Sequence, residues 1–427
     1  MLIRLFLRFA ALGLKFGLTL VVARTLGFDA VAAYGLAVAA SVIASKLLGL
    51  GFSSELNRRL SLRDPLPAIH DARALGVVFC TLYLVVCAAL AIAPLAGLRI
   101  DAFGMPPPVA TWIALVALSE HAASETNAWV YSLHRPRAGS LLLFARTGAW
   151  AGIACAGLLA GAVRSIDTVF ALWFACNACV VTASWRVVRA HARHAHRPAR
   201  FDASPPACRM LGVWLNGLPF YAAGIVLSLL QYLERFVAGS HADAAALGRY
   251  IFVWSIANAV QAVAFSTVVV AAGPGFVRTL ADEPGRLRTR IRRATVASAG
   301  VAALSGVAIL AVQDDLFRLA HESGDTREVA LLAVLLASFV LRAVADVLWT
   351  AAIALRAGLA TMLSMGVVAV VCVPAAWFLT VHFGMPGAAL AHLTASVAIV
   401  AVLARLVARG ARAGTPRATL ETLPDAA

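Results

Sequence analysis

Long apolar runs recur along the whole chain, and they constrain its fold more than any other feature. No segment longer than about 25 residues separates one run from the next. Of the 427 residues, 61% are hydrophobic and 13% are charged, whereas soluble proteins carry about 25% charged residues. A bilayer core about 30 Å thick needs about 20 apolar residues per helix. The sequence therefore predicts an all-α membrane protein with many spans, and it excludes an ordinary soluble enzyme.

The first apolar run is too long for a signal peptide, is interrupted by Arg8 and Lys15, and is followed by no small-residue cleavage site. We therefore expect a retained helix. Hydropathy predicts twelve helices in all, at residues 5–26, 30–55, 75–97, 109–133, 140–163, 166–188, 211–238, 245–272, 293–313, 329–354, 360–381 and 386–409.

The arginines are distributed unevenly between the two sides of these helices. If the N-terminus is inside, the inside segments hold 25 arginines and the outside loops hold six. Cytoplasmic loops of membrane proteins are enriched in Lys and Arg. We therefore expect both termini in the cytoplasm. The net charge of +15 then reports topology, and nucleic acid is not expected as a partner.

The chain divides into two halves that resemble each other weakly. Each half contributes six predicted helices, and a basic, Pro-containing stretch separates the halves. Val22–Gly35 and Leu233–Tyr250 share an Arg, a Gly, an Asp and a Gly/Tyr pair in the same order. Repeats of this kind are common in transporters. We expect a bundle at 1–188, a cytoplasmic linker at 189–210, a bundle at 211–409 and a disordered tail at 410–427.

Five basic residues lie within the predicted spans or at their edges, and each is a candidate for function. A charge at the bilayer centre costs at least about 2.5–3.5 kcal/mol, so it faces water or a partner unless it snorkels to the interface. Lys15 shares a helix face with Arg4 and Arg8. Arg146 lies near a helix end, where it can snorkel. The five are Lys15, Lys46, Arg146, Arg235 and Arg342.

Acidic residues also lie within the spans. In the helix 109–133, Glu120 and Glu125 belong to a polar arc with Asn127, which favours a water-lined cavity. Asp346 follows Arg342 by four residues, so the two can form either a structural ion pair or part of a transport site. Glu234, beside Arg235, completes the set of candidate coupling or proton sites.

One glycine pair and the cysteines have simple interpretations. Gly13-x-x-x-Gly17 is typical of close helix packing. Cys176-x-x-Cys179 has metal-binding spacing but lies inside a predicted span without a second pair, and we expect no metal and no cofactor.

Two stretches of the chain resemble the openings of the two halves of polysaccharide flippases. They are ARTLGFDAVAAYGLAVAASVIASKLLGLGFSSELNRR and LERFVAGSHADAAALGRYIFVWSIANAV. These flippases belong to the multidrug/oligosaccharidyl-lipid/polysaccharide (MOP) exporter superfamily. The two stretches cover about a fifth of the chain. The chain departs from the family at Glu234, where Asp is common, and it lacks the additional helices of lipid II flippases.

The resemblance implies two six-helix bundles around a central cavity. It implies alternating access that moves a polyprenyl-pyrophosphate-linked oligosaccharide, such as an O-antigen or exopolysaccharide precursor, from the cytoplasmic to the periplasmic leaflet. Arg24 and Arg235 match the family most directly, and Lys46, Lys15 and Arg342 would add positive charge around the anionic headgroup. Polysaccharide polymerase or export machinery would be partners.

Three other functions are consistent with parts of the sequence. A cation-coupled drug antiporter of the same superfamily would need a mainly acidic pocket. A membrane enzyme would need a large outside loop, whereas the largest predicted here, 314–328, has fifteen residues; we therefore expect no enzymatic activity. A non-transporting subunit of a polysaccharide synthase complex remains compatible with the sequence.

Overall fold

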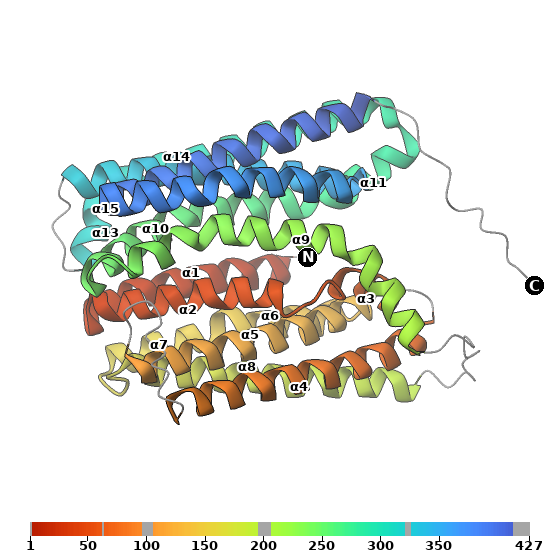
Figure 1. Cartoon of the computed structure of the whole chain (residues 1–427), viewed down its shortest axis with the longest axis horizontal. Coiled ribbons are helices and arrows are strands. Elements are labelled where there is room, and N and C mark those ends of the chain that lie inside the picture. Colours follow the sequence, from red (N-terminus) through yellow and green to blue (C-terminus); the bar gives the residue numbers. More distant parts are fainter. Residues whose placement is uncertain (1, 62–63, 96–105, 195–205, 321–325, 413–427) are drawn as a thin grey trace, which may run out of the picture.

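The computed structural model describes residues 2–61, 64–95, 106–194, 206–320 and 326–412. Helices run side by side along the long axis of the molecule (Figure 1). Helices α4 and α8 lie at one edge, α14 and α15 lie at the other, and α1, α2, α9 and α10 lie between them. A lipid environment favours this architecture because a helix satisfies its own backbone hydrogen bonds.

The described helices of the first half are α1 (Leu2–Leu26), α2 (Phe28–Leu47), α3 (Ser53–Leu60), α4 (Leu66–Leu95), α5 (Pro107–Ser132), α6 (Pro136–Phe144), α7 (Trp150–Leu159) and α8 (Ile166–His194). Those of the second half are α9 (Pro206–Gly239), α10 (Ala244–Ala264), α11 (Val270–Asp282), α12 (Leu287–Ala311), α13 (Gln313–Leu319), α14 (Thr326–Ala354) and α15 (Gly358–Arg412). Two π-helical turns, Ala145–Ala149 and Phe265–Val269, join α6 to α7 and α10 to α11.

The predicted layout of twelve spans is confirmed. Ten described segments are long and apolar enough to cross a membrane. Helix α5, with 26 residues, is long enough to be an eleventh, although its polar residues make it less apolar than the other ten. The twelfth arises because α15 breaks at Gly384, whose φ of 61° is non-helical. The second predicted helix is shorter than expected: it ends at Leu47 because Leu50 and Gly51 adopt positive φ, and the short helix α3 follows.

Glycines in and after the first helix take roles that the sequence did not indicate. Gly27 forms a one-residue connection between α1 and α2 with φ 84° and ψ 177°, a conformation that is essentially restricted to glycine. Gly13 and Gly17 do not mark a close helix crossing, because a Cβ on either would meet no atom within 4 Å. The predicted linker 189–210 overlaps the end of α8 and the start of α9.

The two halves share an apolar core at one end only. One core combines Leu18, Val31 and Trp150 of the first half with Ile251 and Phe339 of the second. At the opposite end, where α1 begins and α15 ends, each half has its own core. We call the end with separate cores the arginine-rich end, because it carries Arg58, Arg59 and the arginines of 278–293. We call the end with the shared core the fused end. The halves therefore diverge toward the arginine-rich end.

A single described bridge crosses the divergence. Helix α9 contains Pro219 and leans toward α3 (Figure 1). The hydroxyl of Tyr221 donates a hydrogen bond to the Leu47 carbonyl oxygen at 2.8 Å, and Gly51 packs on the same tyrosine. This contact connects the halves at one side of the arginine-rich end.

Glycines permit the close crossing of α2 and α10 at the fused end. A Cβ at Gly248 would overlap the backbone carbonyl of Phe28, and a Cβ at Gly35 would overlap the side chain of Ile251. These are the glycines of the Gly/Tyr pairs in the sequence repeat, so the repeat has a physical basis in the contact between the halves. Phe28 and Phe252 pack edge to face beside it, with centroids 5.9 Å apart.

Replacing Gly248 by Val should open the fused end. The new side chain would meet backbone, which cannot rotate away, at a cost of about 1–3 kcal/mol or more. In a cysteine-free background, cysteines at Phe28 and Phe252 should be joined by a short thiol-reactive linker, and G248V should lower the yield several-fold. Gly300→Val is the matched control, since a Cβ at Gly300 meets no atom within 4 Å. Equal yields in both variants would contradict the proposed crossing.

Candidate substrate cavity between the halves

Three adjoining cavities lie between the halves along α1. The first, of about 320 Å³, is lined by α1, α5, α6 and both π-helical turns. The second, of about 380 Å³, is lined by α1, α2, α9 and α10. The third, of about 280 Å³, includes Asp346 of α14. Leu12 lines all three, so α1 forms a continuous wall.

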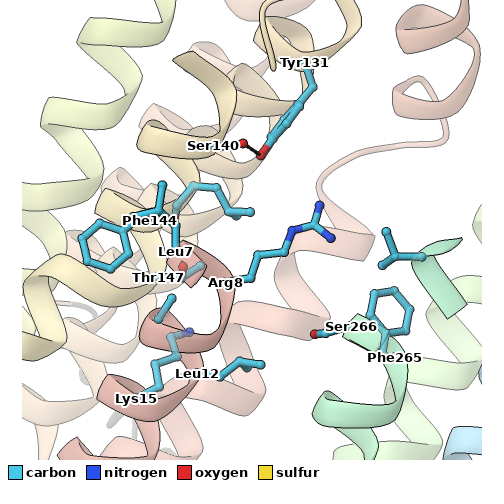
Figure 2. Close-up of a pocket in the computed structure, with 13 residues that line it drawn as sticks. Leu7, Arg8, Leu12, Lys15, Tyr131, Ser140, Phe144, Thr147, Phe265 and Ser266 are labelled. Atoms are coloured by element: carbon cyan, nitrogen blue, oxygen red, sulfur yellow. Dashed lines mark hydrogen bonds between the residues drawn. The ribbon is translucent and has the colours of Figure 1, made fainter. Parts of the chain in front are cut away.

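The first cavity carries positive charge on α1. Arg8 and Lys15 both line it, and Arg8 extends across it toward the turn that carries Phe265 and Ser266 (Figure 2). The two residues are seven positions apart, which is two helical turns, so they share one face. The side chain of Arg4 lies outside the described residues. No carboxylate lines this cavity among the residues described there.

Lys15 lines the second cavity as well, and no carboxylate oxygen of the described residues lies within 4.0 Å of its Nζ. Its Nζ lies 5.6 Å from the centroid of the Trp173 ring. The Glu120 carboxylate is hydrogen-bonded to three other side chains. It accepts hydrogen bonds from Arg146 at 2.8 Å, from the Trp173 indole at 3.0 Å and from Asn177 at 3.1 Å.

Arg146 lies in the π-helical turn Ala145–Ala149 and reaches inward from it. The expectation that it snorkels to the interface is wrong: it forms a largely buried salt bridge with Glu120. π-Helical turns inside α-helices are frequent at functional sites because they redirect side chains. Both described π-helical turns contribute to the wall of the first cavity, through Thr147 on one side and Phe265 and Ser266 on the other.

Arg235 lies in the second cavity and is 1% exposed, so it does not snorkel. Its guanidinium carbon is 3.6 Å from the centroid of the Trp254 ring and 5.0 Å from that of Tyr232. Nη1 donates to the carbonyl oxygen of Gly35 at 3.0 Å, which ties α9 to α2. Nε and Nη2 have no hydrogen-bond partner in the described structure. Arg235 therefore joins the halves and keeps two free donors.

Arg342 and Asp346 do not form the ion pair that their spacing allows. Arg342 is buried and donates to the Ser396 hydroxyl at 2.9 Å and to the Leu230 carbonyl oxygen at 2.8 Å. Asp346 instead accepts a hydrogen bond from Gln261 at 2.9 Å and faces the third cavity. Arg342 is thus held inside the second bundle, and only Asp346 lines a cavity described here.

The other predicted residues lie apart from one another. Arg24 is exposed at the fused end of α1, and Lys46 is exposed at the end of α2. Glu125 is buried and accepts a hydrogen bond from Ser53 at 2.7 Å. Glu234 is buried against Tyr250, whose hydroxyl is 3.5 Å from it. The resemblance places both Arg24 and Arg235 at the headgroup, but here Arg24 is exposed and Arg235 is covered by Trp254.

Several cavity residues were not selected from the sequence. Arg8 was placed on the basic face of the first helix but not chosen as a binding residue. Asn258 and Ser266 are polar residues of the α10–α11 span, and this polarity within an apolar run was the available signal. Trp173 and Trp254 carry no such signal, because a tryptophan in a span is indistinguishable from an ordinary apolar residue.

Comparison with known proteins places the fold. No family model matches the sequence, and no curated protein matches it. Among solved structures, an inward-facing multidrug resistance MATE family transporter of the MOP superfamily aligns with a TM-score of 0.67 at 15% identity, covering 96% of this chain and 100% of that one. The lipid II flippase MurJ in an inward closed conformation aligns with a TM-score of 0.70 at 9% identity, covering 97% and 90%.

An outward-facing MATE family transporter also aligns, with a TM-score of 0.65 at 14% identity, covering 96% and 95%. The chain has the fold of MOP-superfamily transporters. This confirms the two bundles of six helices and the superfamily resemblance at the level of fold. At these identities the likeness does not carry a substrate from any of these proteins to this chain.

The Glu120–Arg146 pair yields a stability prediction. Arg146→Met leaves the buried Glu120 carboxylate without its cation, and loss of one partner of a buried pair costs about 3–5 kcal/mol. We expect a marked fall in the apparent unfolding temperature in detergent. The double variant E120Q/R146M removes both charges, keeps an acceptor for Trp173 and Asn177, and should recover most of the loss. An unchanged unfolding temperature in Arg146→Met, with transport abolished, would instead assign the pair to transport.

Proposed function

We propose that the protein is a flippase of the bacterial inner membrane that carries a polyprenyl-pyrophosphate-linked oligosaccharide from the cytoplasmic to the periplasmic leaflet. The observation that carries the proposal is the charge of the first two cavities. Arg8, Lys15 and Arg235 line them, and none of their described lining residues is a carboxylate. A cavity with this lining favours an anionic headgroup.

The residue types suit pyrophosphate. Lys15 offers a point charge, and Arg235 holds two unpaired N–H donors in a planar fork beneath Trp254, which movement of the halves would uncover. These are two complementary ways to bind phosphate oxygens. The remaining walls are mainly apolar and aromatic, with Phe16 and Val38 in the second cavity. A lipid-linked substrate needs this combination, because the headgroup must be bound while the chain stays in an apolar environment.

The arrangement of the halves suits alternating access. The halves are fused at one end and diverge at the arginine-rich end, which the positive-inside rule assigns to the cytoplasm. In this account the bundles 1–188 and 211–409 rock as units about the cavity, and the basic residues between them stay with the headgroup. The lipid chain would remain in the bilayer throughout, and no cofactor would be required.

A cation-coupled antiporter is the second candidate, and one observation favours it. Asp346 lines the third cavity with Gln231, Asn258 and Gln261, which together form a polar site with one carboxylate. A lipophilic cation or a coupling ion could bind there. The two functions differ in the charge of the substrate, which makes them separable by experiment.

Reconstituted vesicles with a fluorescent polyprenyl-pyrophosphate disaccharide provide the test, with inner-leaflet probe measured by membrane-impermeant quenching. Lys15→Gln and Arg8→Gln should each slow flipping about tenfold or more, since a hydrogen bond to a charged group is worth about 1.5–3 kcal/mol. Arg405→Gln, at an exposed position on α15, should flip at the native rate. Native flipping in the cavity variants would contradict the role proposed for Arg8 and Lys15. No flipping by the native chain, with transport of a lipophilic cation that D346N abolishes, would support the antiporter.

A further inference from the structure

A second basic site lies outside the substrate cavities, in a groove between α11 and α12 at the arginine-rich end. The groove has a volume of about 920 Å³ and is lined by Arg278, Arg286, Arg290 and Arg293 together with two acids, Asp282 and Glu283. We call it the α11–α12 groove. It shares no lining residue with the three cavities between the halves.

The arginines of the groove are not neutralised by its acids. Glu283 pairs with Arg286 at 2.6 Å. For Arg278, Arg290 and Arg293, the described residues provide no carboxylate oxygen within 4.0 Å. The groove therefore holds an excess of positive charge with donors free for a ligand.

Arg290 packs against Gly275 and forms a hydrogen bond with the facing helix. Its guanidinium packs against Gly275, where an added Cβ would lie 2.5 Å from Nη2. Its Nη1 donates to the buried Thr279 hydroxyl at 2.9 Å, across from α12 to α11. This hydrogen bond orients the exposed Arg290 side chain between two helices before any ligand arrives.

Helical register separates these arginines from their neighbours. Arg286, Arg290 and Arg293 recur at spacings of four and three, which places them on one face. Arg288 and Arg292 lie on the opposite face and do not line the groove. Arginines on either face of α12 would satisfy the enrichment of positive charge in cytoplasmic loops. That enrichment therefore does not explain why Arg286, Arg290 and Arg293 gather around one groove.

Exposed apolar side chains lie on the two helices that form the groove. Val277, which precedes Arg278, is 57% exposed, and Val296, one turn beyond Arg293, is 66% exposed. Both lie further from the helix ends than the arginines do. A ligand bound here would meet cations at the level of the interface and apolar side chains immediately beneath them.

We propose that the α11–α12 groove binds the phosphate headgroup of an anionic phospholipid in the leaflet at the arginine-rich end, with the acyl chains along the adjoining valines. Arginine matches phosphate oxygens with a planar fork of donors. Basic sites between helices on the cytoplasmic side are suited to acidic lipid headgroups. The inference does not depend on the substrate proposed for the cavity, because the two sites share no lining residue.

The test is a titration of the detergent-solubilised full chain with short-chain phosphatidylglycerol, followed by native mass spectrometry. Phosphatidylcholine is the zwitterionic comparison. Each arginine near an anionic lipid strengthens binding about five-fold. R278A/R293A should therefore weaken phosphatidylglycerol binding about tenfold or more, whereas the control R288A/R292A, with the same loss of charge, should change it less than about twofold.

Gly275→Ala keeps every charge and displaces only Arg290, so it tests the groove itself and remains informative if the double variant fails to fold. It should weaken binding several-fold. Inorganic phosphate should compete only at far higher concentration than the lipid. Any of four results would overturn the proposal. The first two are an equal loss of binding in R288A/R292A, and native binding in both Gly275→Ala and R278A/R293A. The others are no preference for phosphatidylglycerol over phosphatidylcholine, and inorganic phosphate binding as strong as lipid binding.

Discussion

A charge inside a bilayer must be matched by another charge, by hydrogen bonds or by water, and this requirement organises the structure. Glu120 is matched by Arg146, Trp173 and Asn177. Arg342 is matched by Ser396 and a backbone carbonyl within the second bundle. Arg8 and Lys15 line the cavities between the halves without a carboxylate partner within 4.0 Å among the described residues. The cavity wall stays basic because Glu120 is already paired with Arg146.

The contact between the halves depends on close packing at two glycines. At the fused end, Gly35 and Gly248 allow α2 and α10 to approach so closely that a methyl group would not fit at either position. Arg235 adds a hydrogen bond to Gly35 and a stacking contact on Trp254. A residue that we propose to bind the headgroup therefore also contributes to the contact between the halves. Occupation of the cavity by an anion would draw on the same guanidinium that ties α9 to α2, which couples binding to the contact between the halves.

Much of the fold was predictable from the sequence, because apolar length and arginine placement report directly on spans. Helix ends were less accessible: α2 stops at Leu47 through the backbone conformation of Leu50 and Gly51, which hydropathy does not register. The candidate site was predicted in part. The basic face of the first helix, with Arg8 and Lys15, follows from helical spacing alone. Which charges pair could not be predicted, since Glu120 and Arg146 meet only through the packing of α5 against the π-helical turn after α6.

The central claim is that the cavity between the halves selects an anionic headgroup. Equilibrium binding to the detergent-solubilised protein tests it most directly, with a polyprenyl pyrophosphate, the uncharged polyprenol and a lipophilic cation compared under one salt condition. The account predicts that the pyrophosphate binds at least about tenfold more tightly than the polyprenol, as expected for one or more hydrogen bonds to a charged group. Equal binding of pyrophosphate and polyprenol, or tighter binding of the cation, would contradict it.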